Sequence, residues 1–397
     1  MQLKFLFQQQ QLGDLTIPVS NRDPGQSGIK EFRYVDIACV CNKTFAIREA
    51  KTISSTEAPS RARKVLQADD VIIATTRPYL RSIAIVPKWL NGEICSTGFC
   101  VLRAGSKILP EWIYYWVLSD AFMKQVSPLM RGANYPAVTD SDIRGTKIPL
   151  PPLDEQRRIV GRIKECLSRV EEIERLRQES STAAKSILRS FYHDTYSELL
   201  RDNQSFALGE AGAVFGGGTP SKARSEYWQG TIPWISPKEM KRRYISESAL
   251  FITNEAIEKS STRLITQPSV LFVVRGMILA HSFPVAVNRV PVTLNQDMKA
   301  ISPRDGLNVD YLAAMLKGAE RQVLSRIEVA GHGTRRLQTD HWISIQIPNL
   351  KQDEQEAVLD KVRHIEQLSD TLSELTNSQS INEIRESILR KAFAGEL

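Results

Sequence analysis

The sequence has few cysteines and lacks the short motifs that hold metals, nucleotides or methyl donors. Its five cysteines, Cys39, Cys41, Cys95, Cys100 and Cys166, include no CxxC pair, so we do not expect a structural zinc site. No Gly-x-x-x-x-Gly-Lys-Ser/Thr loop is present, which excludes the usual mode of ATP binding. An odd number of thiols fits a reducing compartment, and we expect a cytoplasmic protein.

Long apolar runs are also missing, since no stretch reaches the roughly 18 residues that span a bilayer. The apolar patch at residues 1–7 breaks into four glutamines, so we expect neither a signal peptide nor a membrane partner. Hydrophobic residues make up 42% of the chain and charged residues 24%, a composition typical of a globular protein. The net charge of +7 favours a polyanionic partner, although charge alone argues affinity and not specificity.

The strongest feature is an internal repeat at half the chain length. The run Ile148-Pro-Leu-Pro-Pro-Leu-Asp-Glu-Gln156 is repeated as Ile347-Pro-Asn-Leu-Lys-Gln-Asp-Glu-Gln355. Each copy leads into a charged run with an apolar stripe, and the runs end on Ser186-Ile-Leu188 and Ser387-Ile-Leu389. Because repeats determine architecture, we expect two copies of one unit, each made of a globular part followed by a long helix.

The repeat predicts an α+β fold in which two mixed, strand-rich domains are separated by two long antiparallel coiled-coil helices with pseudo-twofold symmetry. Short apolar runs such as residues 71–74 and 270–274 alternate with polar turns. Residues 32–40 are expected to form one strand, and the basic segment 58–66 is expected to be a loop. The predicted parts are a first domain at 1–152, a first helical region at 153–200, a second domain at 201–350 and a second helical region at 351–397.

Both helical regions carry apolar residues at the three-and-four spacing of a coiled-coil seam. The predicted seam, where partner chains would also dock, contains Val160, Ile163, Leu167, Val170, Val358, Val362, Ile365, Leu368 and Leu372. Since an isolated helix of this length is marginal in water, the simplest cover for one copy is the other copy. We expect Ser180-Ser-Thr182 to interrupt the first helix. A paired stretch of about 22 residues spans ~33 Å, close to one turn of B-form DNA.

A basic protein with two unlike heads at such a spacing would suit a DNA site with two unlike halves. The spacing alone favours this interpretation no more than a coiled coil that serves only for dimerisation. A structural coiled-coil adaptor therefore stays open at this point.

Three motifs in order resemble the specificity subunit of type I restriction-modification systems. They are the doubled Ile-Pro…Asp-Glu-Gln run, Gly216-Gly-Gly-Thr-Pro-Ser-Lys222 with the following Glu226-Tyr-Trp-Gln-Gly-Thr-Ile-Pro-Trp-Ile235, and the ending Ser387-Ile-Leu-Arg-Lys-Ala-Phe-Ala-Gly-Glu-Leu397. The first domain lacks the Gly-Gly-Thr-Pro-Ser opening and starts instead around residues 34–37.

The resemblance implies two target recognition domains, each reading one half of a split, asymmetric sequence in double-stranded DNA. It implies helices that set the gap between the halves and dock two adenine-methylating modification subunits, which restriction subunits then join. S-adenosylmethionine, ATP and magnesium would belong to those partners. This chain would be a recognition subunit without catalytic or metal-binding residues and without a cofactor of its own.

The candidate DNA contacts are basic or polar residues in expected loops. They are Arg61, Arg63, Arg77, Arg81, Arg131, Asn134 and Tyr135 in the first domain, and Thr219, Lys222, Lys241, Arg243, Arg275, His332, Arg335 and Arg336 in the second. The arginine fork matches guanine O6 and N7, so Arg77, Arg275 and Arg335 are the preferred base readers. Lys241 and Arg243 are the preferred phosphate contacts.

A fused methyltransferase or nuclease carrying its own specificity is the enzyme alternative. Its adenine pocket would need an Asn/Asp-Pro-Pro-aromatic motif, whereas Pro151-Pro152 is followed by Leu153. The run Phe215-Gly-Gly-Gly218 is either a tight turn or a loop whose amides approach phosphate together with Lys222.

Overall fold

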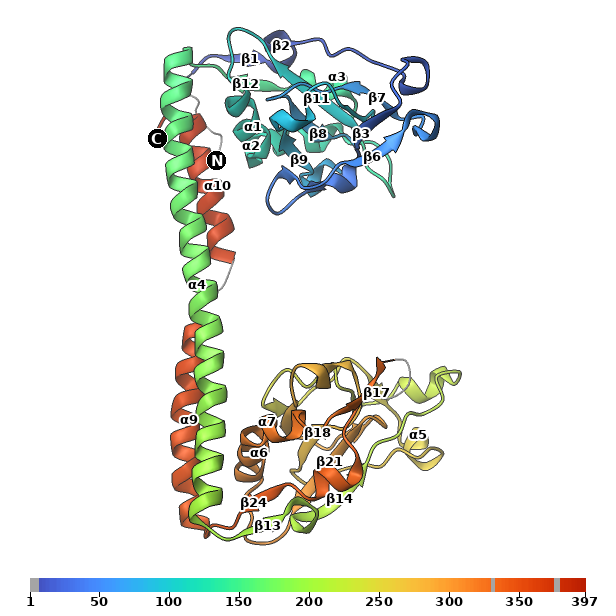
Figure 1. Ribbon diagram of the computed structural model, residues 1–397, viewed down its shortest axis with the longest axis vertical. Helices are drawn as coiled ribbons and strands as arrows, with labels where there is room; N and C mark the ends of the chain where they lie inside the picture. Colours follow the sequence, from blue (N-terminus) through green and yellow to red (C-terminus); the bar gives the residue numbers. More distant parts are fainter. Residues whose placement is uncertain (1–6, 330–332, 375–378) are drawn as a thin grey trace. The chain divides into compact units, whose positions relative to one another are not determined.

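The computed structural model describes residues 7–329, 333–374 and 379–397 of the chain (Figure 1). Two compact units divide it: a first unit of residues 1–176 and 377–397, and a second unit of residues 177–376. Each unit contains one mixed domain and a pair of helices, so the C-terminal segment belongs with the first domain. Figure 1 shows this grouping, with α10 beside α4 in the first unit and α9 beside α4 in the second.

The domain of the first unit is built on two four-stranded sheets, ordered β6-β3-β10-β7 and β2-β11-β8-β9. Its strands are β1 (Gln9–Gln11), β2 (Thr16–Ile17), β3 (Glu31–Val35), β4 (Val40–Cys41), β5 (Ala46–Ile47), β6 (Lys51–Ser54), β7 (Ala62–Val65), β8 (Val71–Ala74), β9 (Ile83–Ile85), β10 (Ile94–Ser96), β11 (Phe99–Ala104) and β12 (Lys147–Pro149). Its helices are α1 (Pro110–Leu118), α2 (Asp120–Val126) and α3 (Asp140–Arg144). Every residue of β8 is buried, which agrees with its uninterrupted apolar sequence.

Two expectations for this domain are wrong. The predicted strand 32–40 ends at Val35, because the Asp36 carboxylate accepts the backbone N–H of Cys39 and caps a short 3-10 turn. The predicted loop 58–66 contains β7, in which Lys64 lies opposite Cys95 of β10. The charge of Lys64 obscured this strand in the sequence. Its ammonium forms an ion pair with Asp140 at 2.5 Å, so the side chain can stay mostly buried.

The domain of the second unit repeats this plan with sheets ordered β14-β21-β18-β19-β16 and β17-β15-β20. Its strands are β13 (Ser205–Ala207), β14 (Gly212–Gly216), β15 (Ile232–Ile235), β16 (Tyr244–Ile245), β17 (Phe251–Ile252), β18 (Val270–Val273), β19 (Val285–Asn288), β20 (Thr293–Leu294), β21 (Met298–Pro303), β22 (Glu328–Val329), β23 (Arg335–Arg336) and β24 (Gln346–Pro348). Its helices are α5 (Asn254–Glu258), α6 (Val309–Gly318), α7 (Glu320–Leu324) and α8 (Thr339–Ile343). The buried strand β18 lies between β21 and β19, as β8 lies between β11 and β9.

The glutamine that ends each repeat motif ties the helix to its domain. Gln156 is fully buried; its carbonyl accepts the N–H of Leu109 at 2.9 Å, and its amide donates to the carbonyls of Lys107 and Pro151. Gln355 makes the same three bonds in the second unit, with the N–H of Asn308 and the carbonyls of Gly306 and Leu350. The repeated sequence therefore encodes a repeated joint between domain and helix.

Helix α4 (Leu153–Asp202) is continuous over 50 residues, so the predicted interruption at residues 180–182 is wrong. The Thr182 hydroxyl donates to the carbonyl of Gln178 at 2.8 Å, which lets this polar residue stay helical. Ser181 and Ala184 are small and buried. Because α4 is 50 residues long, the predicted length of about 22 residues, which matched one turn of DNA, does not apply to this helix.

The second helical region forms α9 (Gln352–Glu374) and α10 (Gln379–Ala394). In the first unit α10 runs antiparallel to α4, because Arg385 pairs with Glu174 while Arg158 donates to the carbonyl of Leu397. In the second unit α9 also runs antiparallel to α4, since β13 directly after α4 pairs with β24 directly before α9. The predicted antiparallel pairing of the helical regions is therefore present within each unit.

The predicted seam is only partly a helix-to-helix seam. Val160 and Ile163 lie in a core cluster with Leu389, Phe393 and residues of the first domain, and Leu167 packs against it. Val170 is also buried, and Val358 and Val362 belong to the core of the second unit. Ile365 is half-buried, whereas Leu368 and Leu372 are 50% and 43% exposed. The buried seam residues are covered by this chain itself, so we no longer expect them to dock partner subunits.

Among the described residues, no helix combines the length and apolar character that a membrane span requires.

Candidate nucleic-acid interface

In the first domain, the turn after the buried strand β8 is held against a glycine-containing hairpin. The N–H of Arg77 donates to the carbonyl of Pro136 at 2.7 Å, and the N–H of Val138 donates to the carbonyl of Thr75 at 2.9 Å. Arg131 and Ala137 exchange two backbone hydrogen bonds that close the hairpin. We call residues 75–80 with 131–138 the first turn–hairpin edge.

The second domain builds the same backbone arrangement after β18. The N–H of Gly276 donates to the carbonyl of Arg335 at 3.0 Å, and the N–H of Leu337 donates to the carbonyl of Val274 at 2.8 Å. Arg275 pairs with Arg336 across a β-bridge. Residues 274–280 with 328–329 and 333–337 form the second turn–hairpin edge; the candidate His332 lies outside the described residues.

The first edge presents a stacked pair of side chains. The guanidinium of Arg77 lies over the ring of Tyr135, 4.4 Å from its centroid, and donates to the carbonyl of Asn134 at 3.5 Å. The ring of Tyr135 is 67% exposed, and Asn134 is exposed beside it. The Nε of Arg77 is buried without a partner among the described residues. The pair is a preformed planar surface with unused donor capacity.

The second edge presents three arginines. Arg275 and Arg336 are exposed and Arg335 is half-buried, and no side-chain partner occurs for any of them within the described ranges. The Nε of Arg335 is buried without a partner there, like that of Arg77 on the first edge. Both edges therefore hold an arginine whose Nε is buried without a partner, and a partly exposed guanidinium of this kind suits a base edge or a phosphate through its terminal nitrogens.

Exposed apolar side chains lie next to these arginines, and the sequence analysis missed them. Tyr79 and Leu80 are 49% and 44% exposed on the first edge, and Met277 and Ile278 are 63% and 41% exposed on the second. Each pair sits in the short 3-10 turn that follows the buried strand. Apolar residues inside an otherwise polar turn were the signal in the sequence that could have found them.

Four of the arginines predicted to contact DNA form ion pairs with carboxylates in this structure. Arg63 pairs with Asp23 at 3.3 Å, and Arg81 pairs with Asp120. Asp142 accepts two bonds from Arg131, at 2.9 and 3.2 Å. Hydrogen bonds from the backbone of Thr139 and from Arg131 lower the pKa of Asp142 to about 2, so the carboxylate stays charged.

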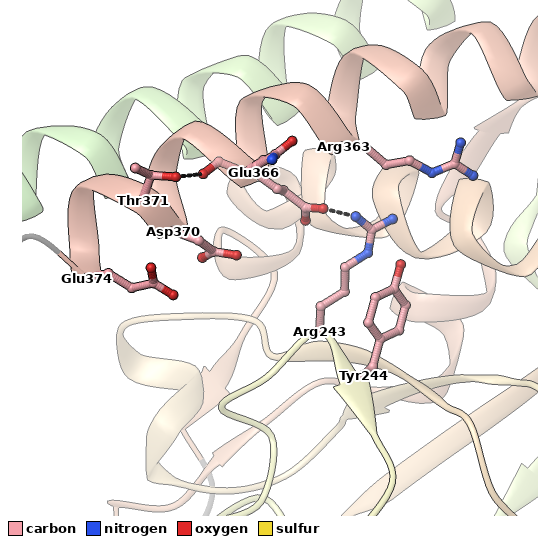
Figure 2. Close-up of a pocket in the computed structure, with 8 residues that line it drawn as sticks. Arg243, Tyr244, Arg363, Glu366, Asp370, Thr371 and Glu374 are labelled. Carbon is pink, nitrogen blue, oxygen red and sulfur yellow. Dashed lines mark hydrogen bonds and ion pairs between the residues drawn. The ribbon is translucent and has the colours of Figure 1, made fainter.

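The fourth, Arg243, corrects a preferred prediction. Figure 2 shows its guanidinium turned toward Glu366 of α9, with which it forms an ion pair, and its side chain is only 14% exposed. We therefore no longer expect Arg243 to contact phosphate. Arg61, Lys222 and Lys241 are exposed and have no side-chain partner within residues 7–329, 333–374 and 379–397, so they keep their predicted role.

The glycine run at 216–218 is explained by close packing of the backbone. A Cβ on Gly217 would lie 1.7 Å from the carbonyl oxygen of Asn295, and the N–H of Gly218 already donates to the carbonyl of Leu294. The Thr219 hydroxyl bonds to Gln296. The tight-turn interpretation therefore accounts for the glycines, and of the two candidate contacts in this loop, Thr219 and Lys222, Lys222 is the one that is exposed and without a side-chain partner among the described residues.

The described residues contain no group of three or more His, Cys, Asp or Glu side chains placed to hold a metal ion. Burial raises the pKa of the Cys95 and Cys100 thiols to about 12, so both stay protonated and unreactive at neutral pH. Trp234 is buried and donates to the carbonyl of Gly218, and Trp228 packs edge-on against it. These residues stabilise the fold, and they leave the two turn–hairpin edges as the candidate site.

The chain combines two mixed domains, long helices and exposed cationic edges. This combination is typical of a class of DNA-recognition proteins. The chain matches the family described as type I restriction modification DNA specificity domain over residues 31–179 and 201–386. It belongs to this family, and the resemblance inferred from the three sequence motifs is confirmed.

Individual relatives agree with this assignment. The chain is 31% identical to the type I restriction enzyme EcoR124I/EcoR124II specificity subunit of Escherichia coli over 276 residues, which cover 68% of this chain and 66% of that relative, just under two thirds of its length. It is similar to the crystal structure of the HsdS subunit from Thermoanaerobacter tengcongensis, with a TM-score of 0.61 and 29% identity over 98% of this chain and 97% of the other. A chain from a structural study of complex assembly and conformational transition of the type I R-M system matches over 100% of both chains, with a TM-score of 0.78 and 29% identity.

Proposed function

We propose that this chain is the DNA-reading specificity subunit of a type I restriction-modification complex and has no catalytic activity of its own. It would bind double-stranded DNA at a bipartite, asymmetric site. The observation that carries the proposal is the turn–hairpin edge, which has the same backbone in both domains and different side chains. Two edges with the same backbone arrangement and different side chains suit two different half-sites. Side chains that contact base edges determine which sequence is read, whereas contacts to the DNA backbone fix the position of the protein along the duplex.

The target recognition domains would be residues 1–152 and 201–350, with spacer helices at 153–200 and 351–397. The helices would also dock two modification subunits, which restriction subunits would join in the cytoplasm. Those subunits would supply S-adenosylmethionine, ATP and magnesium. Support for docking comes from exposed apolar side chains on the helices, which are unusual on a solvated helix and suit a protein partner. They are Ile173, Leu176, Ile187, Leu368, Leu372 and Ile384.

Selection from a pool of randomised duplexes tests the proposal directly. The chain, alone or with its modification subunits, should enrich one sequence in two parts separated by a fixed gap. A methylation and cleavage assay on the purified chain separates the alternatives: activity without added subunits would favour the fused enzyme. No enrichment, together with binding that ignores sequence and salt, would favour a structural adaptor.

Replacing Arg335 with alanine should relax base preference in one half-site only. Loss of an arginine that reads a base edge typically costs about 1–3 kcal/mol of binding free energy at that position. Arg77→Ala is the matched control in the other domain and should affect the other half-site. Selection repeated with each variant measures both effects. Equal weakening of both half-sites by either variant would contradict the assignment of one edge to each half-site.

Replacing Lys241 with alanine should weaken binding to all sequences alike. An exposed lysine without an acidic partner displaces a counterion when it meets phosphate, so its loss should reduce the slope of log affinity against log salt by about 1. Arg242→Ala is the control, because Arg242 is equally exposed but pairs with Glu247 at 2.9 Å. Titrations at several salt concentrations measure the slope. An unchanged slope for Lys241→Ala would remove this lysine from the interface.

A further inference from the structure

In the second unit, a buried group of charges joins the domain to its helices. Glu366 of α9 is only 15% exposed at its side chain and forms ion pairs with Arg243 and, at 3.5 Å, with Lys317 at the end of α6. The Tyr192 hydroxyl on α4 donates to the same carboxylate. One carboxylate therefore holds groups from the domain and from both helices, and we call these four residues the polar anchor.

The repeat shows what occupies the same place in the first unit. Leu167 follows Gln156 by the same number of residues as Glu366 follows Gln355. The Trp112 indole donates to the carbonyl of Pro149 as the Tyr311 hydroxyl does to that of Pro348, and these two bonds fix the register of α1 and α6.

In that register, Leu118 corresponds to Lys317. The repeated Ser-Ile-Leu motif makes Phe393 the counterpart of Tyr192. Leu118, Leu167 and Phe393 all pack in the apolar core of the first unit. Phe45, directly before β5 as Arg243 is directly before β16, packs against the same core. The first unit thus has apolar residues at all four positions where the second unit has three charged side chains and a tyrosine hydroxyl.

The apolar residues of the first unit and the polar anchor of the second unit constrain their domains in different ways. Apolar packing is non-directional, whereas charge-assisted hydrogen bonds require their donors at short range and in defined directions. Burial, and to a lesser degree the Arg243 guanidinium, lowers the pKa of Lys317 to about 8, so its ammonium depends on a nearby carboxylate. Replacing a buried ion pair with apolar residues is often neutral or favourable for stability. Stability alone therefore does not account for the polar anchor.

A cleft borders the anchor on one side. Figure 2 shows Arg243 and Tyr244 facing Glu366, Asp370 and Glu374 across a cleft of about 420 Å³. Val358 and Val362 of α9 pack in the apolar core of the unit, whereas Arg243, next to strand β16, lies against this cleft. Beside the non-directional packing of that core, the bond to Glu366 adds a directional constraint between Arg243 and α9.

We propose that Glu366, with Arg243, Lys317 and Tyr192, positions the second recognition domain in one orientation on its helix pair. The anchor itself is argued from contacts within the second unit. Its consequence for DNA rests on the proposed function: by fixing the second edge relative to α9, the four residues would restrict the gap that the protein accepts between half-sites. They are positioning residues and would not contact DNA themselves.

A distance measurement within the second unit tests the anchor without DNA. Spin labels at Lys238→Cys in the domain and Lys361→Cys on α9, in a full-length chain with Cys39, Cys41 and Cys166 replaced by serine, report the orientation. All three thiols lie in the first unit, and both label sites are exposed. The parent chain should give one narrow distance distribution.

Glu366→Gln should broaden this distribution at least twofold or split it, because the amide carries no charge to hold two cations. Lys317→Arg, which keeps the positive charge opposite Glu366, should keep the narrow distribution. Asp370→Asn is the matched control on the same helix and cleft, because Asp370 adds negative charge near Lys317 without a bond to the anchor among the described residues, and its distribution should stay narrow. A narrow, unshifted distribution in Glu366→Gln would overturn the proposal.

Grafting the apolar residues of the first unit onto the four anchor positions of the second unit separates an effect on domain orientation from an effect on stability. Tyr192→Phe, Arg243→Phe, Lys317→Leu and Glu366→Leu together should give an unfolding midpoint equal to or above that of the parent, with a broadened distribution. If the graft folds and its distribution stays narrow, the anchor has no positioning role. If the graft does not fold, the comparison of Glu366→Gln with Lys317→Arg still decides.

Selection from the randomised duplex pool then tests the consequence. The parent should enrich one gap length, and Glu366→Gln should enrich that gap and its neighbours by one base pair with both half-site sequences unchanged. If the parent enriches no bipartite sequence, the proposed function fails while the distance measurement stands. If the parent enriches one gap and the variant enriches the same one alone, the link between anchor and gap fails.

Discussion

A chain carrying Gln355→Met should unfold with a free energy lower by about 3 kcal/mol or more, and the loss should be confined to the second unit. Methionine fills the space of glutamine but offers no hydrogen bonds to the N–H of Asn308 or to the carbonyls of Gly306 and Leu350. The three bonds are partly shielded from water, and a backbone group that loses its partner in such a place costs about 1 kcal/mol, rising to about 3 kcal/mol where water is excluded. Gln156→Met should have the same effect on the first unit, because its three bonds are equivalent.

Hydrogen exchange followed by peptide mapping distinguishes the units. In Gln355→Met the amides of α6 and α9 should exchange faster, while those of α1 and α10 should keep the rates of the parent chain. Gln367→Met is the control, since Gln367 is an exposed residue of the same helix. A loss below about 1 kcal/mol, within the range of a single ordinary hydrogen bond, would show that this glutamine does not join helix and domain.

Four residues inserted into α4 after Gln178 should shift the gap that the proposed DNA reader accepts. Four helical residues add about 6 Å, close to the rise of two base pairs. The same number of residues must be added between Glu374 and Gln379, so that α9 and α10 keep their own contacts in the two units. Affinity for the original gap should fall about a hundredfold or more, because only one half-site could be engaged at a time.

The position of this insertion follows from the structure. The sequence alone would place it after Val160, early in the predicted seam, but Val160 is 5% exposed and lies in the core of the first unit. An insertion there would disrupt the domain and test nothing about the gap. The control adds residues only between Glu374 and Gln379 and should leave the gap unchanged. An unchanged gap in the α4 variant would show that this helix does not set the spacing.

The sequence repeat made the architecture predictable because each copy forms the same set of hydrogen bonds between its helix and its domain. Asp-Glu-Gln at the start of a charged run identifies a helix start, and its buried glutamine recurs with the same partners. The continuity of α4 was not predictable from Ser180 to Thr182, because such residues end a helix in water but stay helical when their hydroxyls bond to the preceding turn. The strand β7 was missed because Lys64 is paired with Asp140, which lies far away in sequence.

The candidate site was predictable only in part for a similar reason. Residue type and loop position identified Arg77, Arg275 and Arg335, and the structure places them on two equivalent edges. The sequence gives no sign of which arginines have an acidic partner. Arg243 illustrates this, since Glu366, which pairs with it, lies on a helix that the sequence reaches much later. The exposed Met277 was overlooked because apolar residues are normally assigned to the core.

The place of Phe393 in the first unit has a consequence for biosynthesis. Its ring packs against both Trp112 and Trp116, at centroid distances of 4.7 and 4.9 Å. The ribosome makes both tryptophans long before it makes Phe393, so the first domain leaves the exit tunnel without the ring that covers them. The nascent chain must keep this apolar surface open throughout translation of the second domain. The half that is synthesised first is therefore expected to mature last, and it would need protection from a chaperone in the interval.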